Sequence, residues 1–145
     1  MTRLFRYRAT LWLSVAVISS ALCGCGGERT EMDILPDADK ARAALDKALA
    51  AWKSGQKAGK IQTEEAPSIQ VLDSVWKSGV KLTSYEIGQA MDKPGPNGPG
   101  PRWFSVKLRL QDEAEPQQVN YAVLGLDPLQ VFREADYIQA CGMAD

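Results

Sequence analysis

Carboxylates, serines and lysines are the residues of this chain that could do acid–base or nucleophilic chemistry, because its 145 residues include no histidine. That excludes an imidazole base, a histidine-ligated metal and a serine–histidine–aspartate relay. Asp73 and Glu86 are a candidate acid–base pair on neighbouring segments. A capping role for Asp73 before Trp76 and a solvated position for Glu86 explain them better, so we expect no catalytic residue.

The serines are weaker candidates for a nucleophile. Ser74, Ser78 and Ser84 lack the small-residue elbow that exposes a catalytic serine, and they would need a lysine base such as Lys77 or Lys81. We therefore expect a chain that is not an enzyme.

Two acidic clusters are candidate metal ligands, since only oxygen ligands are plentiful. Asp37 with Asp39, and Asp112 and Glu113 with Glu115, do not have the spacing of a calcium-binding loop. A helix start and a hairpin turn explain these clusters. We expect no metal and no cofactor.

The segment PGPNGPGP, residues 94–101, alternates proline with glycine and asparagine. Prolines lack the amides that would cradle a phosphate, so a phosphate site is not expected. The segment is either a stiff recognition loop or a plain hairpin connection, and we favour the connection.

Aromatic residues are the remaining candidates for a binding surface. Trp103 alternates with Phe104 and Val106 and so points to the opposite face of its strand. We expect it to be buried under the loop at 56–68; exposure would instead make it a contact for a partner or ligand. The other candidates are Trp76, Tyr85 and Tyr121.

The N-terminus has the pattern of a secretory signal. Arg3, Arg6 and Arg8 precede a stretch from residue 9 to residue 27 that contains no charge. An uncleaved membrane-spanning helix is the alternative, because about 17–25 apolar residues cross a bilayer.

The end of this stretch, Leu22-Cys23-Gly24-Cys25, resembles the lipobox of bacterial lipoproteins. The resemblance implies that residues 1–24 are a cleaved signal peptide and that Cys25 is acylated. Cys23 is the poorer lipidation candidate, because Leu22 would then precede the cleaved bond, where small residues are preferred. The Cys-x-Cys spacing also suggests a metal site, but it crosses the processing bond.

The lipobox implies a lipid-anchored protein of the cell envelope. Gly26 and Gly27 lack the aspartate that retains some lipoproteins at the inner membrane, which favours the outer membrane, facing the periplasm, in a source with two membranes. Residues 25–35 are polar and form a tether, which reaches at most about 35 Å over ten residues.

Processing also changes the charge and the thiols. Residues 1–24 hold three of the 17 basic residues and no acid, so 14 basic and 18 acidic residues remain, a net charge of −4. This balance argues against a nucleic-acid partner. Cys141 is the only remaining thiol, so no internal disulfide forms. We expect Cys141 to be buried, slow to react and part of a monomer; an intermolecular bridge is the alternative.

One long helix is predicted from Pro36 onward. Its apolar residues recur at the spacing of one helical face, with Asp37 at the start and Gly55 at the end. The face consists of Ala41, Ala44, Leu45, Ala48, Leu49 and Trp52.

Strands are predicted at 82–91, 102–110, 118–126 and 129–133. Their connections are too short for a crossover helix, so they should form an antiparallel meander. Residues 56–68 read as a loop, and 69–72 as either a short strand or the start of a second helix. We expect the helix to pack on Phe104, Val106, Leu108, Tyr121 and Val123.

These elements predict an α+β domain at 36–140, with a helix on a curled antiparallel sheet of about four strands, followed by a tail at 141–145. The plan is cystatin-like. The motifs W52-K-S-G55, V71-L-D73, W76-x-x-G79 and L82-x-x-Y85-x-I87 resemble a group of small uncharacterised bacterial envelope proteins. They are packing motifs, so the resemblance implies no functional residues. We expect a binding or scaffolding domain because the chain has a lipobox, no histidine and no convergent polar site in its sequence. The alternative is a small-molecule or enzymatic pocket between sheet and helix, and a possible partner is another envelope protein.

Overall fold

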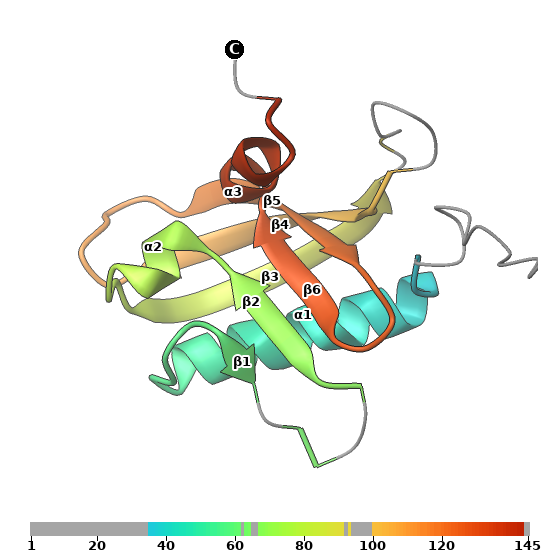
Figure 1. The fold of residues 1–145 in the computed structure, drawn as a ribbon. Coiled ribbons are helices and arrows are strands. Elements are labelled where there is room, and N and C mark those ends of the chain that lie inside the picture. The colour runs from blue at the N-terminus through green and yellow to red at the C-terminus, as the bar shows by residue number, and fades with distance from the viewer. Residues whose placement is uncertain (1–34, 62, 65–66, 92, 94–99, 144–145) are drawn as a thin grey trace, which may run out of the picture.

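A six-stranded sheet lies between two helices, α1 (Ala38–Lys53) on one face and α3 (Glu134–Ala140) on the other (Figure 1). The computed structural model describes residues 35–61, 63–64, 67–91, 93 and 100–143. The α+β class is therefore confirmed. The remaining elements are β1 (Lys60–Ile61), β2 (Ile69–Leu72), α2 (Ser74–Lys77), β3 (Leu82–Met91), β4 (Arg102–Leu110), β5 (Gln117–Leu124) and β6 (Leu129–Arg133).

The helix α1 lies within the predicted segment between Pro36 and Gly55 and has the predicted buried face. All six residues of that face are buried, and they share one core with the five strand residues named above. Gly55 follows the helix with φ +85°, a conformation that glycine adopts without strain. Trp52, at the end of the face, stacks on Trp76 with 5.3 Å between ring centroids.

The sheet has the order β1-β2-β6-β5-β4-β3. The predicted meander is present in β3 to β6, in which all neighbours are antiparallel. The prediction of about four strands was too low, because β1 and β2 extend the sheet and β2 lies parallel to β6. Residues 69–72, for which the sequence left a strand and a helix open, form a strand. These strands have two and four residues, too few to show a clear period in the sequence.

The two faces of the sheet have separate cores. The α1 face holds the larger core, and a smaller one under α3 contains Trp103, Ala122 and Phe132. The sequence analysis did not predict α3, whose seven residues carry no residue that is itself fully buried. As a result, a helix covers part of each face of the sheet, whereas a helix was expected on only one face.

The outer edge of β3 is partly closed by α1. Arg42 on α1 donates to the carbonyl oxygens of Gly88 at 2.6 Å and Ile87 at 2.9 Å. The register of β3 against β4 shifts at this point, so the strand bulges. A Cβ on Gly88 would lie 2.9 Å from the carbonyl oxygen of Ser105, which explains the glycine. These contacts leave fewer free carbonyls for edge-to-edge pairing.

Candidate functional site

The parallel strands β2 and β6 end side by side, and each leads directly into a short helix. Asp73 links β2 to α2, and Arg133 is the last residue of β6 before α3. Ligand sites of sheets with parallel strands commonly lie in the crevice outside the carboxyl ends of those strands. The pair Leu72 and Phe132, opposite each other in the register, marks this end of the sheet.

A buried polar cluster lies beneath these strand ends and consists of Asp73, Tyr121 and Arg133. Asp73 is 3 % exposed and Arg133 is 8 % exposed. The Tyr121 hydroxyl donates to Asp73 Oδ2 at 2.5 Å, and the backbone N–H of Trp76 donates to Asp73 Oδ1 at 3.0 Å. The predicted capping role of Asp73 is therefore confirmed.

Arg133 supplies the positive charge of the cluster. Its Nη1 lies 3.5 Å from Asp73 Oδ1, and its Nη2 donates to Gln117 Oε1 at 3.5 Å. Nη1 is buried and makes no hydrogen bond within the described structure, so the ion pair with Asp73 is its polar contact. Loss of the carboxylate would leave this guanidinium buried with no counter-charge.

Tyr121 is a proton donor in this cluster. Burial raises the pKa of its hydroxyl well above 10.0, and the negative charge of Asp73 and the hydrogen bond to it raise the pKa further. The phenol therefore stays protonated at neutral pH and holds the Asp73 carboxylate in place. The Tyr121 hydroxyl and the Asp73 carboxylate are hydrogen-bonded to each other, which suits a structural role.

The predicted alternative of an acid–base pair is not assembled. Asp73 is buried at the end of β2, whereas Glu86 is exposed on β3 at the other edge of the sheet. Three strands separate β2 from β3. Glu86 pairs in register with Lys107 of β4.

The serine candidates make local hydrogen bonds. The Ser78 hydroxyl donates to the Val75 carbonyl at 2.7 Å. The Ser74 hydroxyl donates to Asp136 Oδ2 at 3.2 Å, and the backbone N–H of Ser74 donates to the same oxygen at 2.9 Å. Ser84 lies on β3, away from the strand ends that carry Ser74.

The acidic clusters have structural contacts as well. Asp37 precedes α1 and forms an exposed ion pair with Lys40 at 3.2 Å. Glu113, in the turn between β4 and β5, accepts a hydrogen bond from Gln117 at 2.6 Å. Within the described residues, no three histidine, cysteine or acidic side chains gather in a way that could hold a metal ion.

A groove lies above the polar cluster, on the α3 side of the sheet. It has a volume of about 410 Å³, within the range of small-molecule sites. We call it the β2–α3 groove. It is lined by Ala58, Gly59, Gln70, Val71, Leu72, Asp73, Ser74, Lys77, Phe132, Asp136, Gln139 and Ala140.

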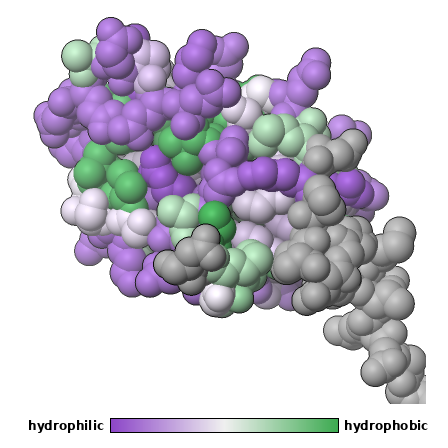
Figure 2. Space-filling model, turned by 90° about the horizontal axis from the view of Figure 1, so that it is seen from above, coloured by the Kyte–Doolittle hydropathy of each residue, from purple (hydrophilic) through white to green (hydrophobic). Residues whose placement is uncertain are grey.

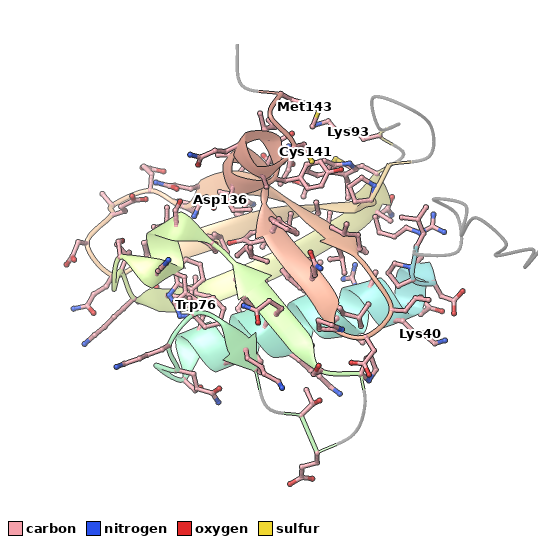
Figure 3. All side chains as sticks on the ribbon, viewed as in Figure 1. Lys40, Trp76, Lys93, Asp136, Cys141 and Met143 are labelled. Atoms are coloured by element: carbon pink, nitrogen blue, oxygen red, sulfur yellow. The ribbon has the colours of Figure 1, made fainter. Side chains whose placement is uncertain are left out.

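The contact between Ser74 and Asp136 joins the two walls of this groove. Figure 3 shows Asp136 on α3, above the end of β2 and α2. Neither Asp136 nor Arg133 was singled out in the sequence. Arg133 had a detectable signal, because it follows the buried Leu129 and Val131 at every second position of β6 and so points to the same inward face. Asp136 had none, because its helix was not predicted.

Trp103 is buried as expected but under a different element. It lies beneath α3, with the Tyr137 ring edge-on at 5.4 Å, instead of under the loop at 56–68. Lys93 lies over the Trp103 ring at 4.7 Å and is hydrogen-bonded to Glu134. Burial favours a higher pKa for Glu134, but the hydrogen bonds from Lys93 and Asn120 outweigh it, so the pKa is lowered.

Cys141 is exposed, which corrects the expectation that it is buried. Cys141 follows Ala140, the last residue of α3, and lies at the exposed C-terminal end of this helix. We therefore expect a thiol reagent to label native Cys141 at a rate close to that of the unfolded chain, measured by mass spectrometry. Labelling that becomes fast only in denaturant would contradict the exposed position.

Comparisons with protein-family models, with curated proteins and with solved structures find no match for this chain. Among the helices in the described part of the chain, none has the length and apolar character needed to cross a bilayer. The lipobox, Cys25, the predicted signal peptide and the segment 94–99 lie outside the described residues.

Proposed function

We propose that this chain is a lipid-anchored protein of the cell envelope, held through Cys25, with a non-catalytic binding or scaffolding domain. The observation that carries the proposal is the order of basic residues, uncharged stretch and Leu22-Cys23-Gly24-Cys25 within the first 25 residues. A lipobox cysteine is expected to carry more than one acyl chain, and two or more hold a protein stably at a membrane. The tether at 25–35 then keeps the domain within about 35 Å of the anchor.

The domain's polar residues support a non-catalytic function. The buried carboxylate, phenol and guanidinium of Asp73, Tyr121 and Arg133 are engaged with one another. Catalytic acids and bases must instead be reachable by the substrate and change protonation during the reaction. Tyr121, with its raised pKa, is poorly suited to give up its proton.

The proposal also covers the protein's localisation and its oligomeric state. In a source with two membranes, the protein would reside at the outer membrane and face the periplasm. The net charge of −4 for residues 25–145 favours a protein partner over nucleic acid, and the partly closed edge of β3 favours a monomer. The succession of α1 and the meander β3 to β6 is consistent with a cystatin-like plan, to which β1, β2 and α3 are additions.

A small-molecule site is the second candidate function, and the β2–α3 groove favours it. The site was expected between the sheet and the long helix, but core side chains fill that interface. The groove instead lies on the α3 side and brings together polar side chains from β2, α2 and α3. Convergent polar groups around an apolar floor are the usual features of a ligand site.

The anchor is tested by replacing Cys25 with alanine. We expect the variant to accumulate as a precursor that keeps residues 1–24 and has no acyl mass, because cleavage of lipobox signals follows lipidation. Intact-mass measurement of the membrane fraction gives the result, and Cys23→Ala is the matched control that should still be processed. A wild-type protein that retained residues 1–24 without acyl mass would favour the membrane-spanning helix instead.

A further inference from the structure

The floor of the β2–α3 groove is apolar, and Leu72 is its exposed part. Leu72 on β2 is 36 % exposed, and its neighbour Val71 is buried in the α1 core, so Leu72 points to the α3 side. Phe132 lies opposite Leu72 in the register of β6; it is 7 % exposed, with the Tyr137 ring of α3 against it, and lines the groove with its remaining surface. Covering Leu72 with an apolar ligand group would remove it from water, which is favourable.

Hydrophilic residues surround this floor. Figure 2, which views the α3 side of the molecule, shows hydrophobic residues in small areas between hydrophilic ones. The groove itself has a volume of about 410 Å³. That volume suits a small ligand better than a broad protein interface, which buries far more surface.

Lysines outnumber acids when the groove is taken together with the residues around it. Lys77 lines the groove, and Lys60 lies on the same face because it pairs in register with Gln70. Lys57 and Lys81 line an adjoining hollow that also includes Lys77.

Of the two acids that line the groove, Asp73 is neutralised by its ion pair with Arg133. Asp136 accepts two hydrogen bonds from Ser74 and keeps its negative charge. The four lysines outnumber this one carboxylate, and Lys77 is the lysine that lines the groove itself. A cation at the rim of an apolar floor complements a molecule with an anionic head and an apolar body.

We propose that the β2–α3 groove binds one small amphipathic anion, for which a medium-chain fatty acid is the simplest representative. Its apolar chain lies on Leu72 and Phe132, and its carboxylate accepts a hydrogen bond from the Lys77 ammonium. Because this names a ligand class for the binding domain, it rests on the function proposed above.

The test uses the mature protein in nanodiscs of zwitterionic lipid, with a photoreactive ten-carbon fatty acid as the probe. Mass spectrometry of the digested protein locates the crosslinks, and decanoate and decanol are compared as competitors. We expect saturable labelling of peptides that contain Leu72 or Phe132, with decanoate competing about tenfold better than decanol, the effect of about 1.4 kcal/mol from one charge-assisted hydrogen bond.

Variants separate the two halves of the site. Lys77→Gln should reduce the advantage of decanoate over decanol to near unity, and Leu72→Gln should weaken both competitors. The matched controls are Lys40→Gln, at the far end of α1 (Figure 3), and Leu126→Gln, which replaces a leucine that is 56 % exposed elsewhere. Both controls should label like the wild type.

Three results would overturn the proposal: labelling spread over the surface without saturation, equal competition by decanol and decanoate, or equal effects of Lys77→Gln and Lys40→Gln. The acyl mass on Cys25 is measured in the same samples. An acylated protein whose groove is not labelled refutes the ligand and leaves the anchor standing. A labelled groove in a protein without acyl mass refutes the anchor and leaves the ligand standing.

Discussion

Asp73→Ala should destabilise the domain by about 3–5 kcal/mol, because it removes one partner of a buried ion pair. The change leaves the Arg133 guanidinium buried without a counter-charge. It also takes away the acceptor of the Tyr121 hydroxyl and the cap of α2. The measurement is the free energy of unfolding by urea denaturation, followed by tryptophan fluorescence.

Two further variants make this result specific. Asp37 also precedes a helix but makes no side-chain capping hydrogen bond and is exposed, so Asp37→Ala should cost less than about 1 kcal/mol. Asp73→Asn keeps an acceptor for the α2 cap and loses only the charge, so it should fall between the two. If Asp73→Ala and Asp37→Ala were equally mild, the buried cluster would not stabilise the fold as argued.

The longest periodic segments were predicted with accurate bounds. In α1, six apolar positions repeat over three helical turns, and only one helix orientation buries them all. In β4, Phe104, Val106 and Leu108 alternate with polar residues, which determines both the strand and its buried face. In these two segments the local pattern and the tertiary packing favour the same conformation.

The short elements could not be predicted, because their stability comes from distant contacts. β2 is held between β1 and β6, and its pairing of Ile69 with Leu129 joins segments far apart in the chain. The seven residues of α3 pack over Trp103, and this contact with the sheet stabilises the helix. Its own sequence shows no apolar period that would predict it. Local propensity is a weak guide where tertiary contacts decide the conformation.

The candidate site depends on these short elements, which explains why Asp73, Ser74, Lys77 and Tyr121 were named separately in the sequence but not brought together. Gly59, Leu72 and Asp136 come from three separate segments and meet only because β2 lies parallel to β6. The carboxyl ends of the two strands then bring α2 and α3 together across the groove. The sequence of 69–72 fits a strand and a helix equally well, so it could not predict that α2 and α3 meet across the groove.

Leu49→Ala should cost about 2–5 kcal/mol of unfolding free energy, the range for a large aliphatic side chain truncated in a packed core. Leu49 is 1 % exposed and belongs to the cluster that joins α1 to the sheet. The alanines beside it on α1 are too small to fill the cavity, so the upper half of the range is expected.

Leu126→Ala is the matched control, because the same atoms are removed from a leucine that is 56 % exposed. It should change the free energy of unfolding by no more than about 0.5 kcal/mol. Urea denaturation of both variants gives the comparison, and the urea dependence should stay constant if each unfolds in two states. Equal effects of the two substitutions would mean that α1 is not packed on the sheet through its 45, 49 and 52 positions, and the two-layer core described for this face would be wrong.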